Sequence, residues 1–249
     1  MISKYLIQHD KTYIATLKFG EKRDTGDSEG KTINEDISFK ISNFSEEQID
    51  KKLQSFIGKN MQIPPMYSAI KLNGKKLYEY ARSGEKIEVQ PREIEIYEME
   101  LKKVDYSENE IQFLVSCSKG TYIRTLCEDI ACRFETVGYM KELNRTRVGL
   151  FKLEDSIEIE DLENNTQDVL NKRFITIEKF FDNKDKIILD SRKKELFLNG
   201  VKLTQKRPDD IYRIYSEDNK FIRIRRNQTK FIKKRCYYLK IQLPRITFI

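Results

Sequence analysis

The sequence predicts an α+β protein with a larger first domain, residues 1–183, and a small, basic, β-rich second domain, residues 187–249. The first observation is a change of hydrophobic period. Apolar residues alternate from Ile111 to Cys117 and then recur at helical spacing from Ile123 to Phe134. The second is a change in composition near residues 183–186, after which short strand-like runs mix with basic residues. A length of 249 residues accommodates one large domain and one small one.

The turn between that strand and that helix is the main candidate site. Gly120 permits a sharp bend, and Ser118 or Thr121 is predicted to cap the helix. Tyr122 and Arg124 belong to the first helical turn but lie off the apolar stripe, so we expect them to face a ligand. Because a helix N-terminus presents free N–H groups, the ligand expected there is an anion such as a phosphate or carboxylate.

Periodicity, caps and turn residues predict the remaining elements. Strands are expected at residues 12–17, 92–104, 148–153, 212–216, 220–225 and 237–243, and helices at residues 45–57, 75–83, 139–147 and 191–198. Ser45 and Gln48 form a capping box at the start of the first of these helices. The strand at 92–104 should contain a bulge before Met99 and pair with residues 110–118 across a polar turn. The glycine-rich stretch from Gly20 to Gly30 is expected to be a loop.

The charge distribution favours a polyanionic partner. The chain carries a formal net charge of +7, and residues 206–245 contain thirteen Lys or Arg against four Asp or Glu. Such a concentration is typical of nucleic-acid contact. Tyrosines such as Tyr67 stand beside cations such as Lys71, a mixture that suits base stacking and phosphate pairing. Tyrosines packed at a domain edge would give the same pattern, so both interpretations stay open.

Cysteine and histidine usage argues against several site types. The four cysteines form no CxxC pair and are expected to be reduced core residues. His9 is the only histidine, which nearly excludes a histidine-based metal site or triad. No apolar run approaches the length of a membrane span. A DNA-binding protein is disfavoured because neither a helix-turn-helix nor a zinc-ligand pattern is found.

Three stretches, in this order and spacing, resemble the TruB-type tRNA pseudouridine synthases. They are Asp10–Tyr13 with the loop Asp24–Gly30, Ile63–Lys71 with its continuation to Gly84, and Ser118–Thr125 with Leu143–Gly149. The resemblance runs from about Lys4 to about Asp155. The basic tail resembles, more weakly, the small PUA-like RNA-binding domain of that family.

The resemblance implies a fold, a substrate and a reaction. The fold is a mixed, largely antiparallel sheet with helices. The partner is the T-arm of tRNA, whose target uridine (uridine-55) is flipped into a cleft and isomerised to pseudouridine. The resemblance further implies no metal and no organic cofactor, no membrane association, a cytoplasmic location and a monomer.

The resemblance also implies roles for individual residues. Tyr13 matches the tyrosine that stacks on the flipped base, and Tyr122 the second tyrosine of the site. Arg124 matches the arginine that pairs with the nucleophilic aspartate, and Leu143 an apolar residue of the uracil pocket. Further substrate contacts are expected from three residues of the matched stretches: Tyr67, Lys71 and Lys119.

The chain departs from the family at the nucleophile. The family's aspartate lies in a Gly-Thr-Leu-Asp-Pro type motif upstream of the strand at 12–17, and the sequence contains no such motif. Asp24 and Asp27 belong to a different, downstream loop and are not assigned as the nucleophile. The expectations are therefore that the chain lacks the family's N-terminal segment, that Arg124 has no carboxylate partner, and that residues 1–40 are poorly ordered. Two functions remain: a pseudouridine synthase by family, or a non-catalytic protein that binds or remodels tRNA.

Overall fold

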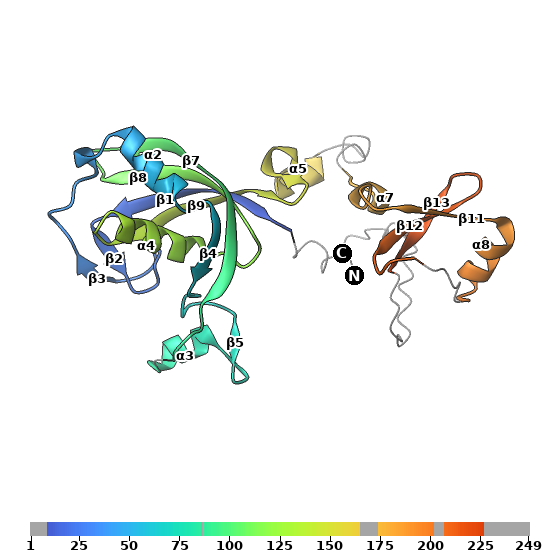
Figure 1. The fold of residues 1–249 in the computed structure, drawn as a ribbon, viewed down its shortest axis with the longest axis horizontal. Coiled ribbons are helices and arrows are strands. Elements are labelled where there is room, and N and C mark those ends of the chain that lie inside the picture. Colours follow the sequence, from blue (N-terminus) through green and yellow to red (C-terminus); the bar gives the residue numbers. More distant parts are fainter. Residues whose placement is uncertain (1–8, 86, 165–173, 202–206, 227–249) are drawn as a thin grey trace. The chain divides into compact units, whose positions relative to one another are not determined.

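A computed structural model describes residues 9–85, 87–164, 174–201 and 207–226 (Figure 1). The chain forms two compact units that divide between Ser156 and Ile157. This division lies earlier than the change of composition at residues 183–186. Each unit is described by itself.

A six-stranded sheet organises the first unit. Its strands run in the order β10 (Phe151–Lys152), β9 (Gly138–Val148), β1 (Lys11–Phe19), β8 (Glu110–Cys117), β7 (Arg92–Asp105) and β4 (Gly58–Gln62). Every neighbouring pair is antiparallel, so the α+β class with a largely antiparallel sheet is confirmed. The expected hairpin of β7 and β8 is present, and the predicted bulge appears as a register shift between Ile96 and Glu98.

Strand β1 is central in this sheet. It pairs with β8 along one side and with β9 along the other. Ala15 and Leu17 are completely buried. The expectation of poor order across residues 1–40 is therefore wrong for β1, because two ladders of backbone hydrogen bonds and a core face hold it.

The short helix predicted over residues 139–147 is also wrong, since this segment is strand β9. Its backbone groups bond to β1 and, near its end, to β10. Pairing along the full length of β1 supplies more hydrogen bonds and burial than an isolated nine-residue helix could, because short helices are marginal without a packed face. The turn at Gly149, with a φ of 56°, then leads into β10, so the strand expected at 148–153 is broken: Val148 ends β9, and Phe151–Lys152 form β10.

Helices cover part of the sheet and close the core. Helix α2 (Glu46–Gln54) begins at the predicted capping box of Ser45 and Gln48. Helix α4 (Ile123–Arg133) buries Ile123, Leu126 and Ile130 in the core. It packs chiefly against β9 and, to a smaller extent, against α2. Cys117 and Cys127 are buried and unpaired as expected, whereas Cys132 is exposed, which corrects the expectation that it is a core residue. Cys236 lies outside the described residues.

The smaller elements of the first unit form its loops and a lobe. They are β2 (Glu21–Arg23), β3 (Thr32–Glu35), the 3-10 helices Ile41–Asn43 and Leu153–Asp155, β5 (Lys71–Leu72), β6 (Lys75–Lys76) and α3 (Leu77–Ser83). Helix α3 ends as predicted at Gly84, whose φ of 72° is left-handed. In Figure 1 the elements α3 and β5 form a lobe below the sheet.

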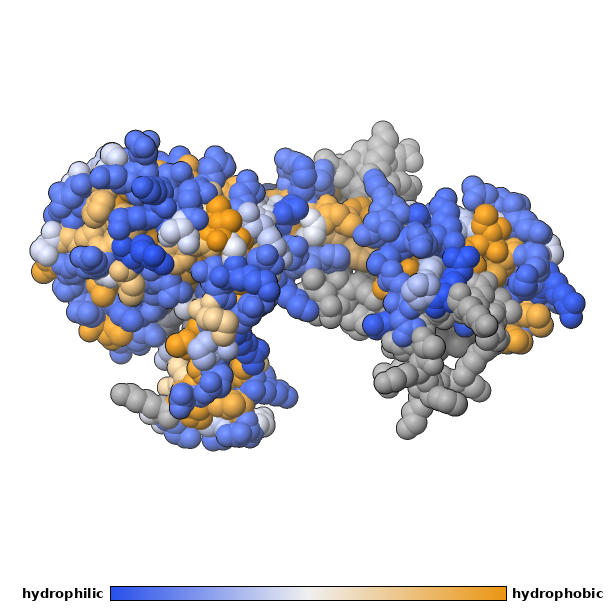
Figure 2. Space-filling view, viewed as in Figure 1, coloured by the Kyte–Doolittle hydropathy of each residue, from blue (hydrophilic) through white to orange (hydrophobic). Residues whose placement is uncertain are grey.

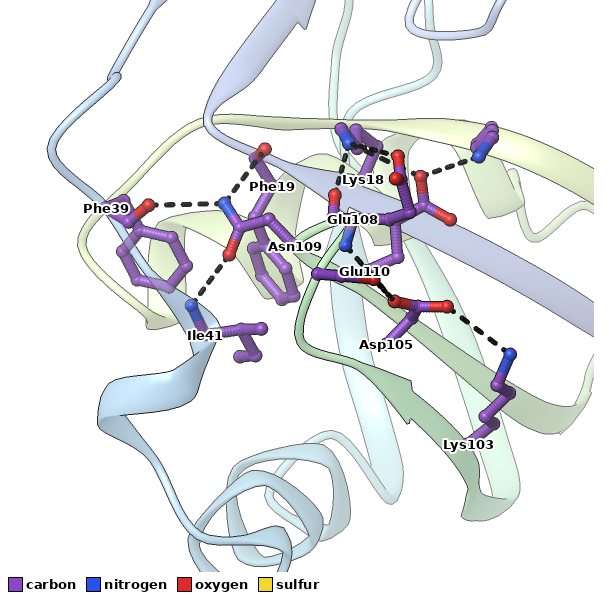
Figure 3. Close-up of polar contacts among 11 residues, drawn as sticks. Lys18, Phe19, Phe39, Ile41, Lys103, Asp105, Glu108, Asn109 and Glu110 are labelled. Carbon is purple, nitrogen blue, oxygen red and sulfur yellow. Dashed lines mark hydrogen bonds and ion pairs between the residues drawn. The ribbon is translucent and has the colours of Figure 1, made fainter.

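Asn109 joins three segments at one end of the sheet (Figure 3). Its side-chain amide donates to the carbonyls of Phe19 at the end of β1 (3.4 Å) and Phe39 (3.2 Å), and its Oδ1 accepts from the backbone of Ile41 (2.7 Å). Its φ of 59° is left-handed, a conformation that asparagine tolerates better than most residues. In the same turn, hydrogen bonds from Ser107 and the Glu108 backbone lower the pKa of Asp105 to about 2. The β7–β8 turn thereby fixes the end of β1.

The second unit has its own small sheet and core. Its elements are α5 (Ile159–Asn164), α7 (Ile177–Phe180), β11 (Lys186–Leu189), α8 (Ser191–Leu198), β12 (Ile211–Ser216) and β13 (Phe221–Arg226). Strand β12 is central, parallel to β11 and antiparallel to β13. The predictions of α8, β12 and β13 are confirmed, while the strand predicted at 237–243 lies outside the described residues.

The surface agrees with the polar composition. Figure 2 shows hydrophilic residues over most of the visible face of the first unit, with apolar residues in small groups. Among the described residues, no helix is both long enough and apolar enough to cross a membrane.

Candidate functional site

Arg124 is the centre of the candidate site. It lies in the first turn of α4, where its guanidinium reaches three oxygens from two other segments. One terminal nitrogen donates to the carbonyl of Thr25 (3.2 Å) and to Oδ2 of Asp27 (3.0 Å), and the other to the carbonyl of Tyr67 (2.8 Å). Its side chain is 23% exposed. The guanidinium therefore connects α4 to the loop Asp24–Gly30 and to the segment before β5.

The ion pair with Asp27 corrects the expectation that Arg124 has no carboxylate partner. Asp27 is itself held in place: its other oxygen accepts from the hydroxyl of Thr25 (2.6 Å) and from the backbone of Glu29 (3.3 Å). Sequence reasoning noted Asp27 but missed this contact, because the two residues are 97 positions apart. No local pattern carries such information.

The loop Asp24–Gly30 is fixed against α4 and β9. The backbone of Met140 donates to the carbonyl of Gly26 (3.0 Å). Gly26 has a φ of 75°, and a Cβ there would lie 2.8 Å from Oε1 of Glu128 on α4. Glu128 in turn pairs with Lys22 at 3.2 Å. A side chain at position 26 would strain the left-handed backbone and displace the Glu128 carboxylate, so glycine is favoured here.

Gln62 holds the start of α4. Its Oε1 accepts from the backbone N–H of Tyr122 (2.8 Å), and its amide donates to the carbonyl of Tyr122 (3.1 Å). Gln62 is only 3% exposed. The predicted caps are wrong: neither Ser118 nor Thr121 caps the helix, because Ser118 instead accepts from the backbone of Glu95 (2.9 Å). Gln62 of β4, 60 positions earlier, instead holds the backbone of the N-cap residue itself.

Tyr13 and Leu143 lie on one face of the sheet. Tyr13 of β1 is opposite Arg145 of β9, and Ala15 is opposite Leu143. Directly opposed residues share a face, and alternate residues of one strand do too. Leu143 is 43% exposed, so part of this face is accessible. Burial raises the pKa of the Tyr13 phenol, Cys117 acts in the same direction, and Arg145 opposes both.

The three other residues predicted to contact the substrate lie on two segments at or near the surface. Tyr67 is half-buried, and its carbonyl is the acceptor for Arg124. Lys71 is exposed at the start of β5, and Lys119 is exposed in the turn before α4. The structure thus joins Arg124 and Tyr67 directly and places Tyr122 at the N-cap of the same helix. The roles of these residues toward a ligand remain predictions.

A groove of about 500 Å³ lies beside the second half of α4. Its lining residues come from α2's end, β4, β7 and α4, and include Phe56, Met61, Ile94, Leu126, Asp129 and Cys132. Burial, aided by the neighbouring Glu128, raises the pKa of Asp129 to about 6. None of the residues predicted for the site lines this groove.

The second unit contains stacked cations. The guanidinium groups of Arg223 and Arg225 lie 4.7 and 5.7 Å from the ring centroid of Phe197. Burial and the neighbouring Arg223 lower the pKa of Arg225. Two close positive charges on an aromatic ring form a surface suited to an anionic ligand. In the part of the chain that the structure describes, no group of three or more His, Cys, Asp or Glu is placed to hold a metal ion.

Comparison with known proteins places the chain in a family. Residues 1–123 match the model described as TruB family pseudouridylate synthase (N terminal domain), and residues 124–181 match that described as tRNA pseudouridylate synthase B C-terminal domain. The tRNA pseudouridine synthase B of Clostridium novyi (strain NT) is 40% identical over 235 residues, which cover 92% of this chain and 78% of that protein. The corresponding protein of Clostridium tetani (strain Massachusetts / E88) is 42% identical over 228 residues, covering 89% and 75%.

A solved structure supports the fold. The match belongs to a crystal structure of a Cbf5–Nop10–Gar1 complex, with a TM-score of 0.61 and 20% identity. It covers 90% of this chain, which spans 62% of the length of that protein. At this identity the likeness concerns the fold. Together with the sequence matches, it leads to one conclusion: the chain belongs to the TruB family of tRNA pseudouridine synthases.

Proposed function

We propose that this chain binds the T-arm of tRNA and provides the base-holding part of a site that isomerises uridine-55 to pseudouridine. The observation that carries the proposal is the position of Arg124. It lies at the start of α4 in a fixed hydrogen-bond network, beside Tyr122, at the residues that match the family's site. The relatives' name, tRNA pseudouridine synthase B, supports the same substrate and reaction class.

In this proposal the target uridine leaves its stack and enters beside the shared face of β1 and β9. Tyr13 stacks on the flipped base, Tyr122 lies beside the ring, and Leu143 forms part of the apolar wall. Flipping costs a few kcal/mol of unstacking, and stacking on an aromatic side chain contributes about 1–3 kcal/mol per base. The reaction breaks the glycosidic bond, turns the uracil and rejoins it through carbon, without a metal or organic cofactor.

RNA contacts outside the pocket complete the proposal. Tyr67, Lys71 and Lys119 contact the T-arm, and the second unit acts as a PUA-like RNA-binding domain. Arg223 and Arg225, stacked on Phe197, support that assignment because their charges are concentrated on one side of a small sheet. The protein in this proposal is a cytoplasmic monomer.

The 249-residue polypeptide itself is proposed to bind but not to isomerise uridine. The sequence contains no Gly-Thr-Leu-Asp-Pro type motif. Asp27 is not proposed as the nucleophile, because both of its carboxylate oxygens are engaged, one by Arg124 and the other by Thr25 and Glu29. Its proposed role is to hold the guanidinium in position. The second candidate function is a non-catalytic tRNA-binding protein. The absence of the Gly-Thr-Leu-Asp-Pro type motif from the sequence favours it.

The test combines binding and product formation on one RNA. The purified chain is mixed with a T-arm stem-loop transcript, binding is measured by fluorescence anisotropy, and pseudouridine by mass spectrometry after chemical derivatisation. Binding without pseudouridine is expected. Pseudouridine formation by the unmodified chain would contradict the proposed inactivity, and its loss in Asp27→Asn would show that Asp27 is required for it. Absence of binding would contradict the proposal as a whole.

A further inference from the structure

Ser68 carries an unusual buried hydroxyl. The residue is 5% exposed, and within the described residues its Oγ is a buried side-chain oxygen for which no protein hydrogen-bond partner is found. Its backbone, by contrast, is bonded on both sides. The N–H donates to the carbonyl of Met66 (2.9 Å), and the carbonyl accepts from the backbone of Tyr78 (3.1 Å). The chain therefore fixes this residue but leaves its hydroxyl without an acceptor.

A comparison with Ser116 shows that burial alone does not explain why the Ser68 hydroxyl has no partner. Ser116 is 3% exposed, and its hydroxyl oxygen is contacted by Oγ1 of Thr12 (3.3 Å) and by the guanidinium of Arg147 (3.2 Å). A buried polar group without a partner is destabilising, and native proteins keep few of them. An alanine at position 68 would remove that cost. The hydroxyl is therefore a candidate for a role that the unliganded protein does not use.

The location of Ser68 points to a ligand of the candidate site. It follows Tyr67, whose carbonyl is held by Arg124, and precedes the exposed Lys71 by three residues. Further cations follow on β6 and α3, where Lys76 and Arg82 lie 5.1 and 5.3 Å from the ring centroid of Tyr78. This positive surrounding favours an anionic acceptor, and a serine hydroxyl donates well to a phosphate oxygen.

We propose that the Ser68 hydroxyl donates a hydrogen bond to a backbone phosphate oxygen of the bound RNA, beside Arg124 and Lys71. The inference rests on the proposed RNA binding and adds a contact to it. Serine has three staggered χ1 rotamers, so rotation of one bond redirects Oγ while the backbone bonds of Ser68 stay in place. The stability lost in the free protein is offset when the RNA oxygen becomes the acceptor.

The experiment compares Ser68→Ala with the matched buried control Ser116→Ala. Urea unfolding gives stability, and anisotropy with the T-arm stem-loop RNA gives affinity. Ser68→Ala should unfold at a slightly higher urea concentration than the unmodified chain yet bind the RNA about ten-fold more weakly, in line with one hydrogen bond to a charged group. Ser116→Ala should unfold at a lower urea concentration and bind with unchanged affinity.

The two variants are expected to change stability in opposite directions, so the measurements distinguish the possible outcomes. Equal RNA affinity in Ser68→Ala and the unmodified chain would overturn the inference while leaving the proposed function intact. A loss of stability in Ser68→Ala would also overturn it, because the hydroxyl would then have a partner in the free protein. Failure of the unmodified chain to bind the RNA would remove the proposed function and this inference together.

Discussion

The two ends of helix α4 differ in how their polar groups are held. At its start, Arg124 and the backbone of Tyr122 make hydrogen bonds of 2.8–3.2 Å to segments that are far away in the sequence. Along its second half, Asp129 and Arg133 line a groove of about 500 Å³, and the pKa of Asp129 is raised to about 6 by burial and Glu128. The start of α4 is therefore held by hydrogen bonds to distant segments. Its second half faces a groove.

The difference between the two ends of α4 shows which side chains the fold holds in one fixed position. Directional hydrogen bonds fix the position of a guanidinium to a fraction of an ångström, which a reaction site requires. A groove lined by both apolar and polar side chains, with one poorly stabilised carboxyl, has no such constraint. Substitutions at the first end should therefore cost stability and those along the second half little or none.

The largest effect is expected for Arg124→Ala. The substitution removes three hydrogen bonds, one of them to a carboxylate, and leaves Asp27 and two carbonyls without their partner. A loss of about 3 kcal/mol in the free energy of unfolding is expected, measured by urea denaturation. Arg133→Ala, the same change at the other end of α4, should cost less than about 1 kcal/mol. Equal losses in the two variants would contradict the comparison.

Gln62→Ala should have the next largest effect. Both polar groups of this buried amide bond the backbone of Tyr122, so their removal leaves the Tyr122 N–H without its acceptor, while the Tyr122 carbonyl keeps its bond from the Leu126 N–H. We expect a loss of about 2 kcal/mol. The control is Gln54→Ala on α2, whose amide donates to the carbonyl of Met99 at a more exposed place. Its loss should be about half as large, and a loss larger than that of Gln62→Ala would contradict the expected order.

Asp27→Asn tests the ion pair with Arg124 alone. Asparagine keeps one acceptor oxygen but removes the charge, and the pair is partly exposed, at 23% and 21% for the two side chains. A loss of about 1 kcal/mol is expected in urea unfolding at low salt, decreasing as salt is added. Asp24→Asn is the matched control, since the Asp24 carboxylate accepts from the backbone of Lys31 and, among the described residues, has no recorded ion pair. If the difference in stability between the two variants does not change with salt, the result would argue against a role for the charge of Asp27.

The smallest effect is expected for Asp129→Asn, and it has the opposite sign. Because the pKa of Asp129 is higher in the folded protein than the ordinary 3.8, the folded state loses stability as the pH rises from about 4 to about 6. Asparagine removes that loss, so the variant should be more stable at pH 7.5 and unchanged at pH 4. The gain should stay below about 1 kcal/mol, because the residue as a whole is exposed and solvent screens its charge, although its carboxyl is partly desolvated. Asp182→Asn, an exposed aspartate of the second unit, should change stability equally little at both pH values.

Local patterns predicted much of the fold correctly. The period change across residues 111–134 predicts β8 and α4, and the capping box at Ser45 predicts the start of α2. These signals are carried by residues within one or two turns of each other. The family and its antiparallel sheet follow from the matched stretches in the sequence.

The tertiary structure decided the points that depend on distant partners. Residues 139–147 have an ambiguous period, and pairing with β1 makes them a strand. Gln62, rather than Ser118 or Thr121, holds the backbone at the start of α4, and Asp27 is the carboxylate that pairs with Arg124. In each case the free energy of a long-range hydrogen bond or ladder exceeds the local preference, and nothing in the local sequence specifies which distant residue supplies it. The sequence by itself determined which residue types stand at the start of α4, and the tertiary structure decided which partners hold them there.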